Sequence, residues 1–213
     1  MRPSPVYSVT FFIDSDCFPL SSIRSSMAKF TFYSWYRGAN PLGWRAGRVA
    51  KLPQLLYVLG ALLGDGCPYL WRSRYQVWLV GEEDFSAKYA EKISTVIGRQ
   101  VKHYKYGKKN AWFVEVQNAE LYFLLREARR DPSILERLVE QAGMGRGWLE
   151  LVDGFFDAEG CVKVTKERVR KTPKICLDAC NADLPLIEAV RSATTKSLGI
   201  QSHLSTPESE SPE

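Results

Sequence analysis

The chain has 213 residues, a formal net charge of +5 and a hydrophobic fraction of 45%, which fits one large globular domain or two small ones. No apolar run approaches the roughly 18 residues needed to cross a bilayer, so a membrane partner is not expected. Five cysteines without CxxC spacing argue against a disulfide framework and against a zinc cluster. We therefore expect a reducing, intracellular and cytoplasmic setting.

Residues 1–50 are interpreted as an N-terminal extension, because they repeat nothing later in the chain. Their apolar pieces are short and interrupted, and no basic region precedes an unbroken apolar core, so the extension does not resemble a signal peptide. Met27 is an alternative to Met1 as the first residue.

A first folding unit is predicted over residues 51–147. Its first helix begins near Pro53 and is apolar on every face from Leu55 to Leu63, which predicts a buried helix that stops at Gly66. The stretch "PYLWRSRYQVWLV" predicts a strand pair with a basic turn, and "DFSAKYAEKISTVIG" an amphipathic helix capped by Asp84. The elements that complete this αββαββα unit are a hairpin turning at 107–110 and helices at 119–130 and 132–142.

A second unit repeats the first at an offset of 94 residues, because "YVLGALLGDGC" begins at Tyr57 and "LVDGFFDAEGC" at Leu151. The identical pairs at this offset are Leu55/Leu149, Val58/Val152, Gly60/Gly154, Gly66/Gly160, Cys67/Cys161 and Arg74/Arg168. The second unit, residues 148–206, has a helix at 148–159, two strands and a second helix. An acidic tail at 207–213 then follows, so we expect this unit to lack a second hairpin and a closing helix.

The two motif helices carry a glycine at mid-helix and an acid at the end. Gly60 and Gly154 are expected to let the two helices pack closely, since glycine inside a helix is otherwise unfavourable. Asp65 and Glu159 would then lie at adjacent helix C-termini, where negative charge needs a cation. Carboxylates and carbonyls without histidine favour Mg²⁺. The alternative is that both acids only cap buried helices at the surface.

These motifs resemble the two motifs of a single-chain LAGLIDADG homing endonuclease, and the resemblance covers about residues 53–201. It implies that Asp65 and Glu159 are metal-binding acids and that the backbone carbonyls of Gly64 and Ala158 also contact metal. Leu63 departs from the family motif, which has Asp there. The fold implied is α+β, with two pseudo-symmetric αββαββα units that form a saddle-shaped sheet surface.

The resemblance implies a monomer that hydrolyses both strands of duplex DNA at a long target site, with Mg²⁺ or Mn²⁺ as cofactor and intron homing as its role. Lys163 is our candidate for a catalytic lysine near the scissile phosphates, and an ordinary DNA contact is the alternative. The family fold also serves maturases, which bind intron RNA, and cleavage-deficient DNA-binding proteins. Both remain alternative functions.

Strand alternation predicts which side chains face DNA. Leu70, Val77 and Leu79 of the first unit, and Val162, Val164, Ile175 and Leu177 of the second, are expected to face the core. The expected DNA contacts of the first unit are Tyr69, Trp71, Arg72, Arg74, Gln76, Trp78, Lys102, Lys105, Lys108 and Lys109. Those of the second unit are Lys163, Thr165, Lys166, Arg168, Arg170, Lys171 and Lys174. Such ribbons fit the major groove, and the alternative is that half of these cations are only solvated.

Overall fold

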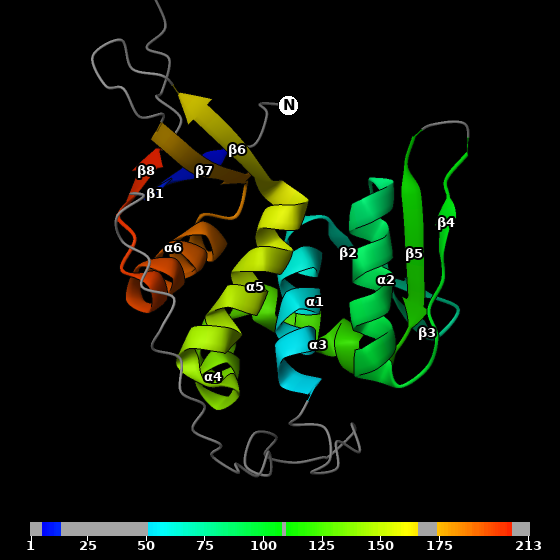
Figure 1. Cartoon of the computed structure of the whole chain (residues 1–213). Helices are drawn as coiled ribbons and strands as arrows, with labels where there is room; N and C mark the ends of the chain where they lie inside the picture. Colours follow the sequence, from blue (N-terminus) through cyan, green and yellow to red (C-terminus); the bar gives the residue numbers. More distant parts are fainter. Residues whose placement is uncertain (1–5, 14–50, 108–109, 166–173, 206–213) are drawn as a thin grey trace, which may run out of the picture. The chain divides into compact units, whose positions relative to one another are not determined.

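The computed structural model describes residues 6–13, 51–107, 110–165 and 174–205 (Figure 1). The chain divides into two compact units, one of Arg24–Ala158 and the other of Met1–Ile23 with Glu159–Glu213. The described residues form α+β structure, as the sequence predicts, with six helices and two four-stranded antiparallel sheets. The sequence predicted only two strands for the second of these sheets. None of the described helices is both long enough and apolar enough to span a membrane.

The first sheet belongs to the unit of Arg24–Ala158, and its strands run in the order β2-β3-β5-β4. These strands are β2 (Gly66–Trp71), β3 (Arg74–Gly81), β4 (His103–Lys105) and β5 (Trp112–Gln117). A tight turn joins β2 to β3, in which Arg72 and Ser73 both adopt positive φ angles of 46° and 64°. The predicted strand pair with a basic turn is confirmed.

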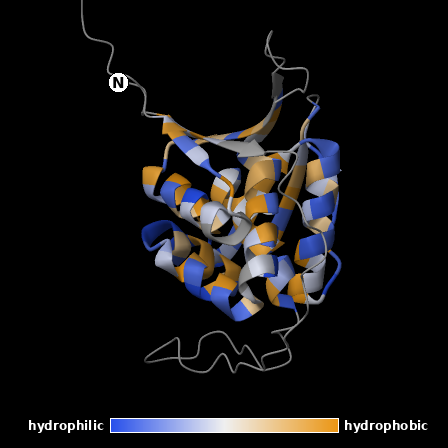
Figure 2. Cartoon of the chain, turned by 60° about the vertical axis from the view of Figure 1, so that its left-hand side comes forward, coloured by the Kyte–Doolittle hydropathy of each residue, from blue (hydrophilic) through white to orange (hydrophobic). Residues whose placement is uncertain are grey.

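Five helices accompany this sheet, and Figure 2 shows that helices of the chain carry both hydrophobic and hydrophilic residues. They are α1 (Leu52–Gly64), α2 (Glu83–Ile97), α3 (Ala119–Arg130), α4 (Ser133–Ala142) and α5 (Met144–Glu159). α2 packs on β3 and β5, and α3 packs on β2 and β3, while α1 contacts α2, α3 and α4. α1 is buried from Leu55 to Leu63, as its uniformly apolar sequence predicts.

Three expected helix boundaries are corrected. Asp84 does not cap α2, because the capping position is occupied by Glu82, whose side chain makes no capping bond. Gly66 does not end α1 in a left-handed conformation; it starts β2, and a Cβ there would lie 2.5 Å from the Cα of Leu62. α5 begins at Met144 rather than at residue 148. The glycine-rich start of α5 is a weak helix signal, which explains the late expected boundary.

α1 and α5 touch at their central glycines. A Cβ on Gly60 would lie 2.8 Å from the backbone nitrogen of Phe155, and one on Gly154 would lie 3.0 Å from the backbone nitrogen of Ala61. Such distances exclude any side chain unless the backbones move apart. Each glycine is therefore explained by the close approach of the other helix.

The second sheet belongs to the other unit, and its strand order is β6-β7-β1-β8. Its strands are β1 (Tyr7–Ile13), β6 (Gly160–Thr165), β7 (Lys174–Asn181) and β8 (Ser202–Ser205). α6 (Leu184–Leu198) packs on β1 and β7. Asp183 caps its start by accepting a 3.2 Å hydrogen bond from the backbone of Leu186, and Gly199 ends it with a φ angle of 65°.

β1 corrects the expected domain boundaries. The sequence analysis treats residues 1–50 as an extension and residues 148–206 as an incomplete unit, but Tyr7–Ile13 is an interior strand of the second sheet. It pairs antiparallel with β7, as β5 pairs with β3 in the first sheet. A repeat search along the chain could not find this strand, because β1 precedes its motif helix whereas β5 follows its own.

Candidate functional site

Asp65 lies immediately after α1, in the unit of Arg24–Ala158. Asp65 is exposed, yet neighbouring protein atoms remove part of the water around its carboxyl. This desolvation raises the pKa of the carboxyl above its usual range. Among the residues that the structure describes, none donates a hydrogen bond to this carboxylate. A nearby cation would therefore stabilise its ionised form.

Arg129 of α3 contacts the same helix end from another direction. Its Nη2 atom donates to the backbone oxygens of Leu62 at 3.0 Å and of Gly66 at 2.7 Å. These bonds join the last turn of α1 to the first residue of β2 and place positive charge against the negative end of the helix. The sequence does not predict this contact, because nothing in the pattern of α3 indicates that one of its arginines reaches α1.

Glu159 ends α5 and belongs to the unit of the second sheet. The side-chain amide of Asn181 donates a 2.8 Å hydrogen bond to Oε1 of Glu159. The Oδ1 atom of Asn181 accepts a 2.9 Å bond from the backbone of Asp183, which fixes the orientation of the amide. Asn181 therefore holds the carboxylate of Glu159 at the end of β7. No sequence pattern predicts this contact.

Lys163 projects from β6 and forms an ion pair with Asp178 of β7, with 2.5 Å between Nζ and Oδ2. The hydrogen bond and charge of Asp178 raise the pKa of Lys163. Burial opposes the ionisation of Asp178, but the hydrogen bond and charge of Lys163, with a smaller contribution from the Thr10 hydroxyl, outweigh it, so the pKa of Asp178 lies below its usual range. Lys163 is thus a protonated, positioned cation rather than a freely solvated one.

Aromatic rings form a row across the first sheet. Tyr69 of β2 lies 4.5 Å from Trp78 of β3, and Trp78 lies 5.4 Å from Phe113 of β5, between ring centroids. Phe113 lies 5.2 Å from Tyr104 of β4, so the row reaches all four strands. Tyr69 and Tyr104, near the two edges, are exposed. Strand alternation predicts Tyr69 and Trp78 on this face but does not predict the row.

Gln76 is less accessible than expected for a DNA contact. It is only 7% exposed, and its Nε2 atom donates a short hydrogen bond to Oε1 of Glu115. Two residues expected in the core also differ, because Leu70 is 52% exposed and Val162 is 65% exposed. Both lie in strands at the edge of a sheet, where alternation does not guarantee that a helix covers the inner face.

Some of the basic residues predicted to contact DNA lie within the residues that the structure describes, and others lie outside them. Arg72 lies over the ring of Trp71, 4.8 Å from its centroid, and both residues are exposed. Arg74, Lys102 and Lys105 are also exposed. The expected contacts Lys108, Lys109, Lys166, Arg168, Arg170 and Lys171 lie outside the described residues, as do the side chains of Thr165 and Lys174.

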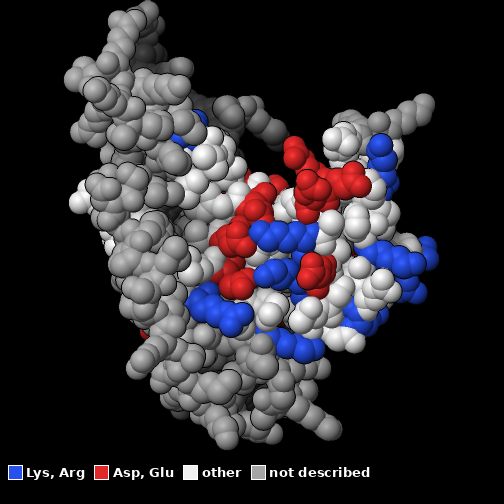
Figure 3. Space-filling view, viewed as in Figure 1, with Lys and Arg blue, Asp and Glu red and all other residues white. Residues whose placement is uncertain are grey.

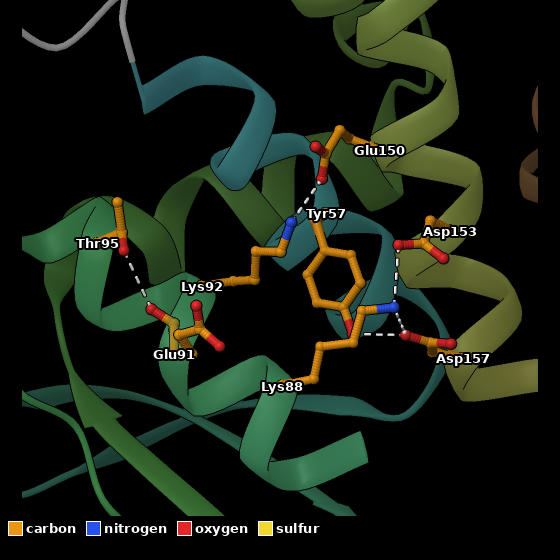
Figure 4. A network of polar contacts seen from close by, with 8 residues as sticks. All are labelled: Tyr57, Lys88, Glu91, Lys92, Thr95, Glu150, Asp153 and Asp157. Atoms are coloured by element: carbon orange, nitrogen blue, oxygen red, sulfur yellow. Dashed lines mark hydrogen bonds and ion pairs between the residues drawn. The ribbon is translucent and has the colours of Figure 1, made fainter. Parts of the chain in front are cut away.

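A polar cluster that the sequence analysis missed joins α2 to α5 (Figure 4). Lys88 contacts Asp153 at 3.0 Å and Asp157 at 2.7 Å, and the hydroxyl of Tyr57 also donates to Asp157 at 2.7 Å. Lys92 adds a 3.0 Å ion pair to Glu150. Figure 3 shows acidic and basic side chains interleaved on this face. The spacing of these residues on one helical face was the signal that could have revealed the cluster.

The structure is similar to solved structures of homing endonucleases. A structure of mesophilic variants of the homing endonuclease I-DmoI has a TM-score of 0.39 and 13% identity, and the match covers 71% of this chain and 92% of that one. The I-LtrWI LAGLIDADG homing endonuclease bound to target DNA has a TM-score of 0.40 and 12% identity, with 74% and 79% covered.

I-DmoI in complex with DNA and Mn has a TM-score of 0.38 and 13% identity, with 70% of this chain and 97% of that chain covered. No protein-family model matches the chain, and no curated protein does. At such TM-scores the function of this chain has to be argued from its own residues.

Proposed function

We propose that the chain is a divalent-metal-dependent endonuclease that recognises a long duplex DNA site and cuts both strands. One observation carries the proposal: the same helix–acid–hairpin arrangement occurs twice. Asp65 and Glu159 are each followed by a glycine that starts a hairpin, and the two hairpins share one register, with Gly66 opposite Leu79 and Gly160 opposite Ala179. A duplicated acid suits a substrate with two strands.

The residues around Asp65 fit a hard divalent cation. Its carboxylate has a raised pKa and accepts no hydrogen bond from the described residues, while the backbone carbonyl of Gly64 offers a second oxygen. No described cluster of three His, Cys, Asp or Glu side chains could hold a metal, so water and phosphate oxygens would complete the ligands. Glu159 and the carbonyl of Ala158 would play the same part in the second motif. Mg²⁺, or Mn²⁺ in its place, would supply Lewis-acid activation of water and would neutralise phosphate charge.

Residues beyond the acids would orient the reacting groups. Asn181 donates a hydrogen bond to Oε1 of Glu159, so that the carboxylate keeps one orientation. Lys163 holds its proton in the ion pair with Asp178, so it would stabilise phosphate charge instead of acting as a general base. In this role Lys163 lowers the energy of the charged transition state.

The outer face of the first sheet supplies further DNA contacts in this proposal. Arg72 and Arg74 are exposed at and beside the β2–β3 turn, where a two-stranded ribbon can enter a major groove. Lys102 and Lys105 near β4 would contact phosphates and set affinity rather than sequence preference. The protein would act as a monomer inside the cell, where its DNA substrate lies.

A second candidate function rests on exposed aromatic rings in the row and beside it. Exposed rings on a sheet face stack on unpaired bases, which is how many proteins bind single-stranded RNA. Tyr69, Trp71, Tyr104 and Tyr106 are between 37% and 58% exposed. An RNA maturase of the same fold, with intron RNA as its partner, would use these rings. A cleavage-deficient DNA-binding protein would keep the DNA contacts alone.

The functions are distinguished by selecting substrates without assuming a sequence. The full chain is incubated with a randomised duplex DNA library in about 10 mM Mg²⁺, an ion that carboxylates, phosphates and water can coordinate together. Cut molecules are ligated to an adaptor and sequenced. We expect one sequence family with breaks at fixed positions in both strands, and none in EDTA. Binding of single-stranded RNA without any cut duplex would favour the maturase instead.

A further inference from the structure

The two sheets have the same internal topology, although the chain enters them differently. The order β2-β3-β5-β4 corresponds strand by strand to β6-β7-β1-β8, and every neighbouring pair in both sheets is antiparallel. The shared hairpin register fixes the correspondence of β2 with β6 and of β3 with β7. β1 therefore occupies in the second sheet the position of β5 in the first. The second sheet is therefore a circular permutation of the first, because its third strand comes from the start of the chain.

β1 is held as an interior strand. Val9 is fully buried, and it lies opposite Ala179 of β7, also fully buried, and Leu204 of β8. Without β1, β7 would present an open edge and β8 would have no neighbour in the described sheet. The segment from Tyr7 to Ile13 is thus required for the second sheet rather than added to it.

The polar residues of β1 lie on the face of the sheet opposite the core. Because Val9 faces the core, Ser8 and Thr10 face the other side, and directly opposite residues share a face. Thr10 lies opposite Asp178 of β7 and opposite His203 of β8. The ion pair between Asp178 and Lys163 places Lys163 on this face too.

Thr10 lies directly opposite Asp178 in the register of β1 and β7, and its hydroxyl helps to lower the pKa of that carboxyl. The Oδ1 atom of Asp178 is buried and has no hydrogen-bond partner among the described residues, while Oδ2 binds Lys163. A buried carboxylate depends on the few groups that favour its charge. Loss of the Thr10 hydroxyl would therefore weaken the hold of Asp178 on Lys163.

We infer that β1 forms part of the nucleic-acid-binding face of the second sheet. On this face Thr10 positions Lys163 through Asp178, and Ser8 contacts the DNA duplex. This inference rests on the proposed function for its DNA partner. Hydroxyl groups contact phosphate oxygens and base edges alike, and Ser8 and Thr10 are the described hydroxyl residues of β1 on this face. The N-terminal segment thereby belongs to the functional surface of the second unit.

The test uses full-length variants and a duplex selected from the randomised library by the wild-type chain. Thr10→Val should lower the single-turnover cleavage rate about tenfold, the effect of one hydrogen bond to a charged group. Its Kd for the same duplex should stay within about threefold, and Thr10→Ser should restore the rate. Thr195→Val makes the same change at an exposed residue of α6 and should alter neither quantity. Ser8→Ala should weaken binding instead of the rate.

A second readout in the free protein needs no DNA. Carbon-13 NMR titration of the Asp178 carboxyl should show a higher pKa in Thr10→Val than in the wild type, and recovery in Thr10→Ser. An unchanged pKa, or a wild-type cleavage rate in Thr10→Val, would overturn the inference. If the wild-type chain cuts no duplex, the proposed function fails, while the titration still decides whether Thr10 acts on Asp178.

Discussion

The side-chain amide of Asn181 at the end of β7 donates a 2.8 Å hydrogen bond to the carboxylate of Glu159 at the end of α5. In the first sheet the corresponding position is Gly81, which has no side chain to offer Asp65. The two motif acids are therefore held differently within their own units. Glu159 has a fixed amide, and Asp65 has no such donor among the described residues.

This difference predicts unequal effects on the two DNA strands. Asn181→Ala should slow cleavage of one strand about tenfold through the lost hydrogen bond, so that nicked duplex accumulates. The measurement is strand-resolved cleavage of end-labelled duplex. Asn110→Ala, at an exposed turn residue, serves as the control and should leave both strands unchanged. Equal slowing of both strands by Asn181→Ala would show that Asn181 acts on the whole fold rather than on Glu159.

Gly60→Ala should destabilise the protein strongly, because the added Cβ would lie 2.8 Å from the backbone nitrogen of Phe155. Overpacking of this kind costs about 1 to 3 kcal/mol, measured as the free energy of unfolding in urea. Gly145→Ala is the matched change in the same helix pair, since nothing lies within 4 Å of a Cβ there. It should change the free energy of unfolding by less than about 1 kcal/mol, because Gly145 is the second residue of α5 and the full cost of glycine applies to the middle of a helix. Similar stability changes for the two variants would contradict the close approach of α1 and α5.

Lys88 should stabilise the unit of Arg24–Ala158 in a pH-dependent way. Burial lowers the pKa of Lys88, but its hydrogen bonds to Asp157 and Asp153 outweigh burial and raise that pKa. Folding therefore favours the protonated form, and its contribution is complete below the unfolded pKa of about 10.4 and is lost as pH rises through the folded pKa.

The stability difference between wild type and Lys88→Met should then be constant from neutral pH to about pH 10 and shrink above it. Urea unfolding at a series of alkaline pH values measures this difference, with Lys105→Met as the control at an exposed residue of β4. The pair is partly exposed, so an effect of no more than about 1 kcal/mol is expected. A difference that grows with alkaline pH would contradict the sign of the shift.

Val9→Asp should unfold the second sheet without affecting the first unit, because it introduces an unpaired charge at a fully buried position. Hydrogen exchange should show lost amide protection in β7, β8 and α6 and unchanged protection in α1 to α4. Val6→Asp is the control, since Val6 is 57% exposed just before β1. A chain started at Met27 should behave like Val9→Asp. Normal protection of β8 in that shortened chain would show that β1 is dispensable.

The sequence predicted the parts of the fold that depend on local pattern. The buried α1, the basic β2–β3 turn and the helices of residues 119–130 and 133–142 follow from apolar periodicity and turn chemistry. The position of β1 could not be predicted in this way, because β1 pairs with β7, which lies more than 160 residues later in the sequence. Thr10 and Asp178 are one of these pairs. No local signal records such a pairing.

The candidate site divides in the same way. Asp65 and Glu159 are recognisable from a repeated motif, whereas their supporting residues come from other elements. Arg129 reaches α1 from α3, and Asn181 reaches Glu159 from β7, through contacts that depend on tertiary packing. The burial of Gln76 against Glu115 was not predicted for the same reason, since alternation gives the face of a strand but not the neighbour that covers it.

The central claim is that each motif acid supports metal-dependent cleavage of DNA. It is tested most directly by strand-resolved cleavage of the selected duplex in Mg²⁺ by wild type, Asp65→Asn, Glu159→Gln and the control Asp84→Asn, an exposed acid of α2. We expect the control to cut both strands at the wild-type rate. Each motif variant should lose double-strand cleavage by about 100-fold or more, a size typical of a removed transition-state contact, while binding the duplex within a few-fold. Cleavage of both strands at the full rate by Asp65→Asn or Glu159→Gln would contradict the claim.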